Sequence, residues 1–260
     1  MTAFFRIEQL AISFGGLQAL AGIGLTLRKG EIFSVIGPNG AGKTTLFNCI
    51  SGLYRPDSGT IDFKGDRLQN KKPDRIARLG IARTFQNIEL FAHMNTMDNI
   101  MLGRHIFMRT GLLRGAFMWG RRSFTGREEV RHRQKVEEII DFLDLQAVRN
   151  KLVGALPYGT QKLIELGRAL ALEPELLLLD EPCAGMNTEE KQDMIFWVKD
   201  IQDELGITIL LIEHDMNMVM DISDRILVIN FGRPITQGLP SEVRKHPGVL
   251  KAYLGVEAAV

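Results

Sequence analysis

The chain has 260 residues, of which 45% are hydrophobic and 24% are charged, and its formal net charge is +1. This composition is that of an ordinary globular protein and excludes a disordered or collagen-like chain. The small net charge gives no sign of a nucleic-acid coat or of steering toward acidic substrates. With only two cysteines, a disulfide framework is not expected, and a reduced, cytosolic setting fits best. The first residues do not resemble a signal peptide, and no apolar run approaches the roughly 18 residues needed to span a bilayer.

The N-terminal part of the chain predicts strands, then a loop and a helix. From Phe5 to Ile36 short alternating segments are broken by glycines, as in antiparallel strands leading into a buried strand at Ile32–Ile36. Apolar residues at helical spacing over Gly37–Ser51 predict a loop and a helix. The residues Ser58–Gly65 predict a hairpin, and a short helix is expected over 73–80, with a proline in its first turn.

In the middle of the chain the sequence pattern changes from strand-like to helical. From about Ile88 to Leu156 no strong strand signal is present, and apolar residues recur at helical spacing, so we interpret residues 88–165 as an inserted helical subdomain. Three apolar runs separated by helical patterns follow, and they predict further strands of a central sheet: Glu175–Leu179, Ile207–Ile212 and Arg225–Ile229. The expected fold is α/β over 1–260 as one domain, with a mostly parallel central sheet, an antiparallel β subdomain and the helical insertion.

A phosphate-binding loop follows the first buried strand. Its glycines would let backbone N–H groups approach the phosphates, and the helix N-terminus adds a positive end. Lys43 would neutralise phosphate charge, and the Thr44 hydroxyl would ligate Mg²⁺. A structural glycine-rich turn is the alternative, but a strand before the loop and a helix after it favour ATP binding. The predicted nucleotide-binding residues are Gly37, Pro38, Asn39, Gly40, Ala41, Gly42, Lys43, Thr44 and Thr45.

Two adjacent carboxylates end the strand that begins near Glu175. Phosphoryl transfer needs charge neutralisation and an oriented nucleophile, and a buried strand delivering two acids can meet both needs. We assign Asp180 to the metal and Glu181 to the attacking water as general base. Two solvated acids at a strand end would be the plain alternative without the phosphate loop.

The motifs and their order resemble the nucleotide-binding subunit of ATP-binding-cassette (ABC) transporters over nearly the whole chain. The stretch Leu156–Thr160 stands in the place of the family's LSGGQ signature, and GRAL at 167–170 resembles its ARAL pattern. The resemblance implies an ABC cassette of the P-loop NTPase type that hydrolyses MgATP at a head-to-tail dimer interface. It also implies that a helix N-terminus binds the partner's ATP through Pro157, Tyr158, Gly159 and Thr160.

The signature departs from the family pattern in ways that affect chemistry. Pro157 replaces the serine that donates to the γ-phosphate and has no N–H of its own, and Tyr158 replaces a glycine. We expect Pro157 to be the first residue of the helix. Asn187 in Ala184–Asn187 stands where the family has an aspartate. These departures predict that one of two composite sites is weaker and that the ATPase pair is unequal.

Three further positions match roles in the family. Phe14 matches the aromatic residue that stacks on adenine, although a core position is the alternative. Gln86 matches the glutamine that reaches Mg²⁺ and the attacking water, whereas an isolated glutamine is usually a surface residue. His214 matches the histidine that senses the γ-phosphate, whereas a lone histidine is more often structural.

The amino-acid sequences of several segments make the resemblance more specific. They resemble the larger ATP-binding subunit of branched-chain amino acid importers. These segments are GPNGAGKTT, RTFQN, the long stretch Met101–Thr125 and the ending Ala252–Gly255. From Arg104 to Lys135 nine Arg or Lys residues stand against two Glu, interleaved with apolar residues. This basic segment fits contact with membrane head groups or with a membrane-embedded partner, and equally a solvated face over a local apolar cluster.

The resemblance implies a cytoplasmic ATPase subunit, peripheral on the inner face of the plasma membrane. It would pair with a second such ATPase, identical or different, and drive an integral membrane permease for amino acids, served by a substrate-binding protein. Hydrolysis would use Glu181, Gln86, Lys43 and His214, with Mg²⁺ on Thr44, Gln86 and Asp180. The alternatives are an exporter ATPase for lipid or polysaccharide, and a soluble ABC ATPase acting on nucleic acid or ribosomes. Because no coiled coil, zinc module or second cassette is visible, we expect no nucleic-acid partner.

Overall fold

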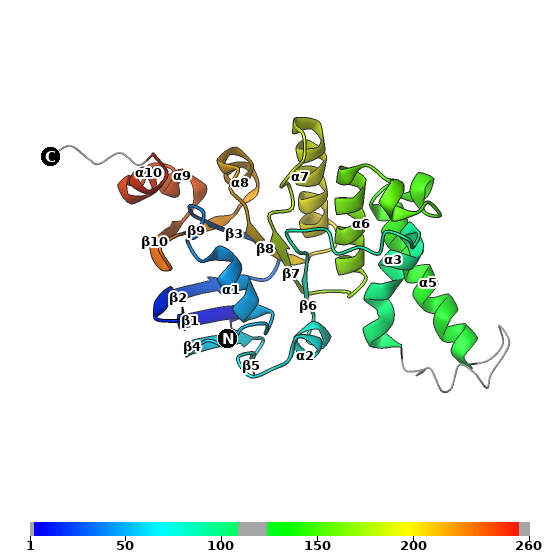
Figure 1. Ribbon diagram of the computed structural model, residues 1–260, viewed down its shortest axis with the longest axis horizontal. Helices are drawn as coiled ribbons and strands as arrows, with labels where there is room; N and C mark the ends of the chain where they lie inside the picture. The colour runs from blue at the N-terminus through cyan, green and yellow to red at the C-terminus, as the bar shows by residue number, and fades with distance from the viewer. Residues whose placement is uncertain (1–2, 109–123, 255–260) are drawn as a thin grey trace. The chain divides into compact units, whose positions relative to one another are not determined.

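The computed structural model describes residues 3–108 and 124–254 of the chain. These residues form two compact units (Figure 1). The first unit takes its described residues from Met1–Gln86 and Glu175–Val260, and the second takes them from Asn87–Pro174. The second unit is therefore inserted into the sequence of the first.

The first unit is built on a six-stranded sheet in the order β10-β9-β3-β8-β7-β6. All neighbours in it are parallel except β9 and β10. Every residue of β3, β7 and β8 is buried, as expected for central strands covered on both faces. The mostly parallel central sheet predicted from the sequence is confirmed. Its strands are β3 (Ile32–Ile36), β6 (Ile81–Arg83), β7 (Leu176–Asp180), β8 (Thr208–Ile212), β9 (Arg225–Asn230) and β10 (Arg233–Gly238).

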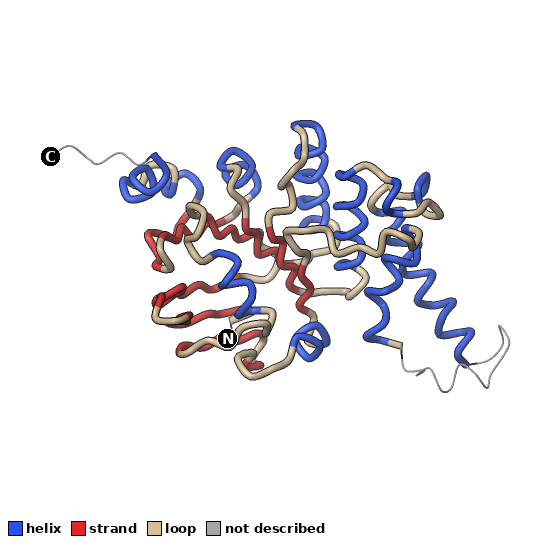
Figure 2. The backbone as a smooth tube through the Cα atoms, viewed as in Figure 1, coloured by secondary structure: helices blue, strands red, loops and turns tan. Residues whose placement is uncertain are grey.

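A second, antiparallel sheet has the order β2-β1-β4-β5, which confirms the predicted β subdomain. Helix α1 (Lys43–Ile50) lies between the two sheets (Figure 2), and Leu46, Phe47 and Ile50 share one core with residues of both. Helix α1 is thus held by apolar packing on two sides. The antiparallel strands are β1 (Phe5–Phe14), β2 (Leu17–Leu27), β4 (Ser58–Phe63) and β5 (Asp66–Arg67).

The opposite face of the six-stranded sheet carries a second, smaller core. Alternate residues of β9 serve the two faces: Leu227 and Ile229 join the core with α1, whereas Ile226 and Val228 join the smaller one. Helical residues including Val219 and Val243 complete it. The remaining helices of this unit are α2 (Pro73–Arg78), α7 (Thr188–Asp203), α8 (Met216–Ile222), α9 (Pro240–Val243) and α10 (Pro247–Leu254).

The second unit is helical. A single isolated bridge between Asn95 and Leu152 is the one β interaction within its described residues. Its elements are α3 (Thr96–Gly103), η1 (Arg104–Phe107), α5 (Phe124–Phe142), η2 (Gln146–Val148), η3 (Val153–Ala155) and α6 (Tyr158–Leu170). Across the part of the chain that the structure describes, no helix combines the length and the apolar character needed to cross a membrane.

Two strands were not predicted. Strand β6 has three residues, too few to show a periodic pattern. Strand β10 reads RPITQG and has no buried residue, because it is the antiparallel edge of the sheet. Polar edge strands lack the apolar run by which the central strands are recognised.

Candidate active site

The loop between β3 and α1 is shaped by glycines in close contact with the rest of the unit. A Cβ on Gly37 would lie 2.1 Å from the carbonyl oxygen of Ile229, and one on Gly42 would lie 2.6 Å from that of Ala19. Gly42 also has φ 103°, in the left-handed region that favours glycine. The loop leads into the N-terminus of α1, where backbone N–H groups without intrahelical partners favour an anion.

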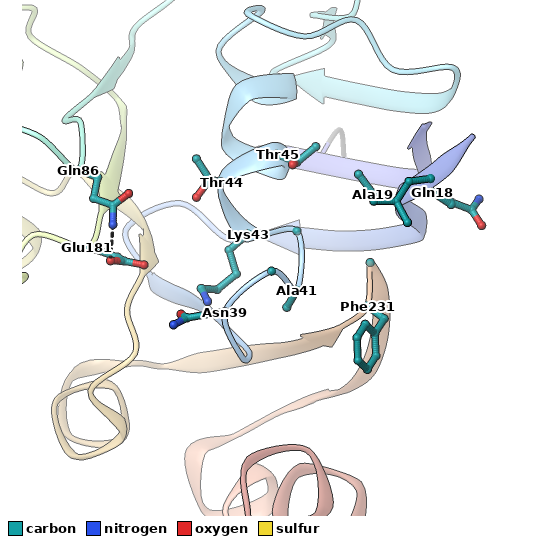
Figure 3. Close-up of a pocket in the computed structure, with 14 residues that line it drawn as sticks. Gln18, Ala19, Asn39, Ala41, Lys43, Thr44, Thr45, Gln86, Glu181 and Phe231 are labelled. Carbon is teal, nitrogen blue, oxygen red and sulfur yellow. Dashed lines mark hydrogen bonds between the residues drawn. The ribbon is translucent and has the colours of Figure 1, made fainter. Parts of the chain in front are cut away.

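A cavity of about 600 Å³ opens at this loop (Figure 3). Its volume is typical of a pocket for a small-molecule ligand. The loop and α1 form one side, the start of β2 and the β9–β10 turn form another, and Gln86 and Glu181 complete it. The lining residues are Leu17, Gln18, Ala19, Asn39, Gly40, Ala41, Gly42, Lys43, Thr44, Thr45, Gln86, Glu181, Phe231 and Gly232.

Lys43 is the cation of the cavity. Its Nζ donates to the carbonyl oxygens of Gly37 at 2.7 Å and Pro38 at 3.2 Å. Burial lowers the pKa of Lys43, and the nearby carboxylates of Glu181, Asp180 and Glu213 oppose that shift. The Lys43 ammonium group thus lies at the phosphate loop, where it can donate hydrogen bonds to a phosphate.

Three of the predicted catalytic residues lie close together here: Gln86 and Glu181 line the cavity, and His214 lies beside Glu181. The amide Nε2 of Gln86 donates to Oε2 of Glu181 at 2.9 Å (Figure 3). The Nδ1 atom of His214 lies 3.9 Å from the same oxygen, and the Glu181 side chain is only 15% exposed. Glu181 follows β7 with φ 49°, a conformation that directs the chain away from the strand. A carboxylate held this way can accept a proton from a water molecule beside it.

Asp180 lies at the end of β7 and forms a buried ion pair. Its Oδ2 accepts from the guanidinium of Arg83 at 2.8 Å, and the two side chains are 2% and 7% exposed. Arg83 also donates to the side chains of Asn48 at 2.7 Å and Ser51 at 2.8 Å. Arg83 thus fixes the Asp180 carboxylate against the far end of α1.

Oxygen donors suited to Mg²⁺ are present around the cavity. The Thr44 hydroxyl and the Gln86 amide belong to its lining, and Asp180 adjoins Glu181 in the chain. Mg²⁺ prefers carboxylate, hydroxyl and carbonyl oxygen together with phosphate oxygen. The chemistry of this donor set therefore fits the predicted ion, with Asp180 already bound to Arg83 through one oxygen.

Phe14 ends β1 and is not a core residue. It is 45% exposed, and its ring packs edge to face on Tyr54 with 5.1 Å between ring centroids. The core alternative is therefore wrong, while stacking on adenine stays a prediction. Phe231, which the sequence did not single out, is 82% exposed and lines the cavity itself.

The signature-like segment begins helix α6 in the second unit. The helix starts at Tyr158 with Pro157 as its N-cap, so the prediction that Pro157 is the first helical residue is wrong by one position. Gln161 N–H already bonds the Pro157 carbonyl, whereas the N–H groups of residues 158–160 precede the first intrahelical bond. Pro157 and Tyr158 are exposed, Thr160 is half-buried and Gly159 is buried.

Arg104, the first cation of the basic segment, is not available to a membrane. It is 5% exposed, donates to the Ala171 carbonyl at 2.8 Å and to His132 Nδ1 at 3.2 Å, and pairs with Glu173 at 3.2 Å. Its role within the second unit is structural. Residues 109–123 of the basic segment lie outside the described residues.

Asn187, which stands where the family has an aspartate, caps helix α7. Its Oδ1 accepts the Glu190 N–H at 3.0 Å, and the Glu190 carboxylate accepts the Asn187 N–H at 3.0 Å, forming a capping box. Asparagine and aspartate are both good N-caps, so the replacement preserves the helix start.

Replacing Asn187 with alanine is therefore expected to destabilise the protein by about 1 kcal/mol. For a chain of this size that corresponds to a melting temperature lower by roughly 2–4 °C. Asn187→Asp, which keeps the cap, is the matched control and should melt with the wild type. Equal losses in the two variants would show that the cap is not what Asn187 contributes.

The fold and the cavity define a P-loop nucleotide-binding cassette, and comparison with known proteins specifies the family. Residues 20–184 match the model of the ABC transporter family, and residues 233–259 match that of the branched-chain amino acid ATP-binding cassette transporter. The chain is 40% identical over 250 residues to the high-affinity branched-chain amino acid transport ATP-binding protein BraF of Pseudomonas aeruginosa, with 96% of this chain and 97% of that protein covered.

Two further comparisons agree. The chain is 40% identical over 249 residues to LivG of Escherichia coli, a protein with the same description, with 96% of each covered. Its structure matches the ADP conformation of MJ1267, an ATP-binding cassette of an ABC transporter, with a TM-score of 0.84, 31% identity and coverage of 98% of this chain and 100% of that one. The chain therefore belongs to the ABC transporter family, as an ATPase coupled to transport, and the family predicted from its motifs is confirmed.

Proposed function

We propose that this chain binds MgATP in the cavity at its phosphate loop and that hydrolysis there drives import of amino acids, most specifically branched-chain ones. The observation that carries the enzymatic part is the contact between Gln86 and Glu181 in the same cavity as Lys43. The cargo rests on the match of residues 233–259 and on relatives described as branched-chain amino acid transport proteins.

In the proposed reaction each residue has a separate task. Lys43 and the loop N–H groups hold the β- and γ-phosphates, and His214 contacts the γ-phosphate. Glu181, positioned by the Gln86 amide, orients a water molecule and accepts its proton. Mg²⁺, held by Thr44, Gln86 and Asp180, would neutralise phosphate charge. Phe14 would stack on the adenine, as its exposure permits.

The proposed assembly pairs this chain head to tail with a second cassette, identical or different. The N–H groups at the start of α6 would bind the γ-phosphate of the partner's ATP. With Pro157 in place of a hydroxyl donor, that composite site would turn over more slowly than one with the usual serine. The pair would dock on a membrane permease at the inner face of the membrane, and a substrate-binding protein would deliver the cargo.

Affinity purification of the tagged chain from detergent-solubilised membranes of its own cells tests the assembly. We expect the chain to copurify with integral membrane permease subunits and with a second cassette in fixed proportion, identified by mass spectrometry. A purified complex that contains ribosomes or nucleic acid and no membrane protein would contradict the proposal, because it would indicate a soluble ABC ATPase.

A further inference from the structure

Glu213 is a completely buried acid to which the proposed reaction assigns no role. It follows β8 directly, precedes His214, and is 0% exposed. Burying a carboxylate is costly unless hydrogen bonds replace those that water made. The contacts of Glu213 therefore indicate what its burial achieves.

Both carboxylate oxygens of Glu213 accept a backbone N–H. Oε1 accepts from Cys183 at 2.9 Å, and Oε2 accepts from His214 at 3.0 Å. The His214 imidazole lies on the same side, with Nδ1 3.6 Å from Oε2. Cys183 is two residues beyond Glu181, so this one side chain joins the segment that carries Glu181 to the segment that carries His214.

A backbone hydrogen bond also joins the Glu181 and His214 segments, but it lies at the end of the sheet, just before the residues that Glu213 connects. The Glu181 N–H bonds the Ile212 carbonyl at 2.9 Å, at the end of the β7–β8 ladder. Both strands end at that point, β7 at Asp180 and β8 at Ile212, and β-sheet pairing no longer sets the spacing of the residues that follow. Glu213 spans the loops where His214 Nδ1 must stay near the Glu181 carboxylate, 3.9 Å away.

We propose that Glu213 is a positioning residue for ATP hydrolysis, holding the Glu181 and His214 segments at a fixed separation. The inference rests on the proposed roles of Glu181 and His214. It requires two acceptor oxygens at position 213, because each faces an N–H donor. A glutamine has the same shape and one acceptor fewer, and its NH₂ group would meet a donor.

The Glu213→Gln variant tests this in the full chain within the purified transporter. We expect kcat for ATP to fall by about 10- to 100-fold, since small displacements of reacting groups have effects of this size. The KM for ATP and the Kd of a slowly hydrolysed ATP analogue should stay within about twofold, because Lys43 is held by the carbonyls of Gly37 and Pro38 and not by a hydrogen bond to Glu213. Should this variant melt below the assay temperature, Glu213→Asp, which keeps both acceptors on a shorter side chain, replaces it, with a smaller fall in kcat expected.

Glu31→Gln is the matched control for loss of a buried carboxylate. Glu31 is 6% exposed, accepts the Arg28 N–H and pairs with Arg225 at 2.7 Å, at the end of β3 away from the phosphate loop. We expect this variant to melt at a lower temperature with unchanged kcat. A Glu213→Gln variant with kcat within about twofold of wild type, or with losses of kcat and of analogue binding in equal proportion, would overturn the inference.

A double-variant cycle separates this inference from the proposed roles. If Glu213 acts by positioning His214 and Glu181, Glu213→Gln should lower kcat less in a His214→Ala background than in the wild type. Full additivity would contradict positioning. If His214→Ala and Glu181→Gln both keep normal turnover, the proposed roles fail; if both lose it while Glu213→Gln keeps it, only the positioning role fails.

Discussion

The Glu181→Gln variant is expected to bind ATP with wild-type affinity and to lose nearly all turnover. Glutamine keeps the size of the side chain, and its amide oxygen can still accept the hydrogen bond from Gln86 Nε2. It cannot accept a proton from water at neutral pH, and general-base catalysis contributes roughly 10²- to 10⁴-fold to rate. Phosphate release per second should therefore fall by about that factor in the assembled transporter.

The control for this variant is Glu189→Gln, which makes the same change of charge on an exposed residue in the first turn of α7. It should hydrolyse ATP at the wild-type rate. The Kd of a fluorescent ATP analogue should be the same for the wild type, Glu181→Gln and Glu189→Gln. Normal turnover in Glu181→Gln would contradict the assignment of Glu181 as the general base. His214, or a water held by Gln86, would then be the group to test.

Replacing Arg83 with methionine is expected to have the largest effect on stability. The change removes the guanidinium from the Asp180 carboxylate, whose side chain is 2% exposed, together with the bonds to Asn48 and Ser51. Removing one partner of a buried ion pair typically costs about 3–5 kcal/mol, because the remaining charge is left in a poorly solvated place. Chemical denaturation of the purified chain would measure the loss.

Two companion variants make that result specific. Arg75→Met removes an arginine that is 73% exposed and pairs with Asp74 on the surface, and it should change stability by less than about 1 kcal/mol. Adding Asp180→Asn to Arg83→Met removes the buried charge and should restore part of the lost stability. A loss below about 1 kcal/mol for Arg83→Met, or no recovery in the double variant, would contradict the role of the pair.

The parts of the fold recognised from the sequence are those with strong local signals. Strand β7 reads LLLLD and is buried throughout, so a continuous apolar run predicted it correctly. The phosphate loop was also recognised from its sequence, because its glycines form a distinctive pattern. Close backbone contacts, such as that of Gly37 with Ile229, explain why glycine is needed there. Strand β10 was not predicted, because an exposed edge strand carries polar residues and lacks an apolar run.

The parts of the site that the sequence did not reveal are charges inside the core. Arg83 and Glu213 lie next to apolar residues, yet a charged side chain in a pattern is normally read as exposed. Their partners, Asp180 and Cys183, are distant in sequence, and only the parallel sheet brings each pair together. Arg104 is the same case in the second unit, a buried cation within a basic run.

In the proposed function, ATP hydrolysis by this chain powers import of branched-chain amino acids. The most direct measurement reconstitutes the complete transporter with its binding protein in proteoliposomes and records ATP hydrolysis and uptake of radiolabelled leucine together. We expect leucine, isoleucine and valine to stimulate hydrolysis and to accumulate in the vesicles only when ATP is present on the side that carries this chain. Hydrolysis indifferent to these amino acids, with no leucine accumulation, would contradict the account.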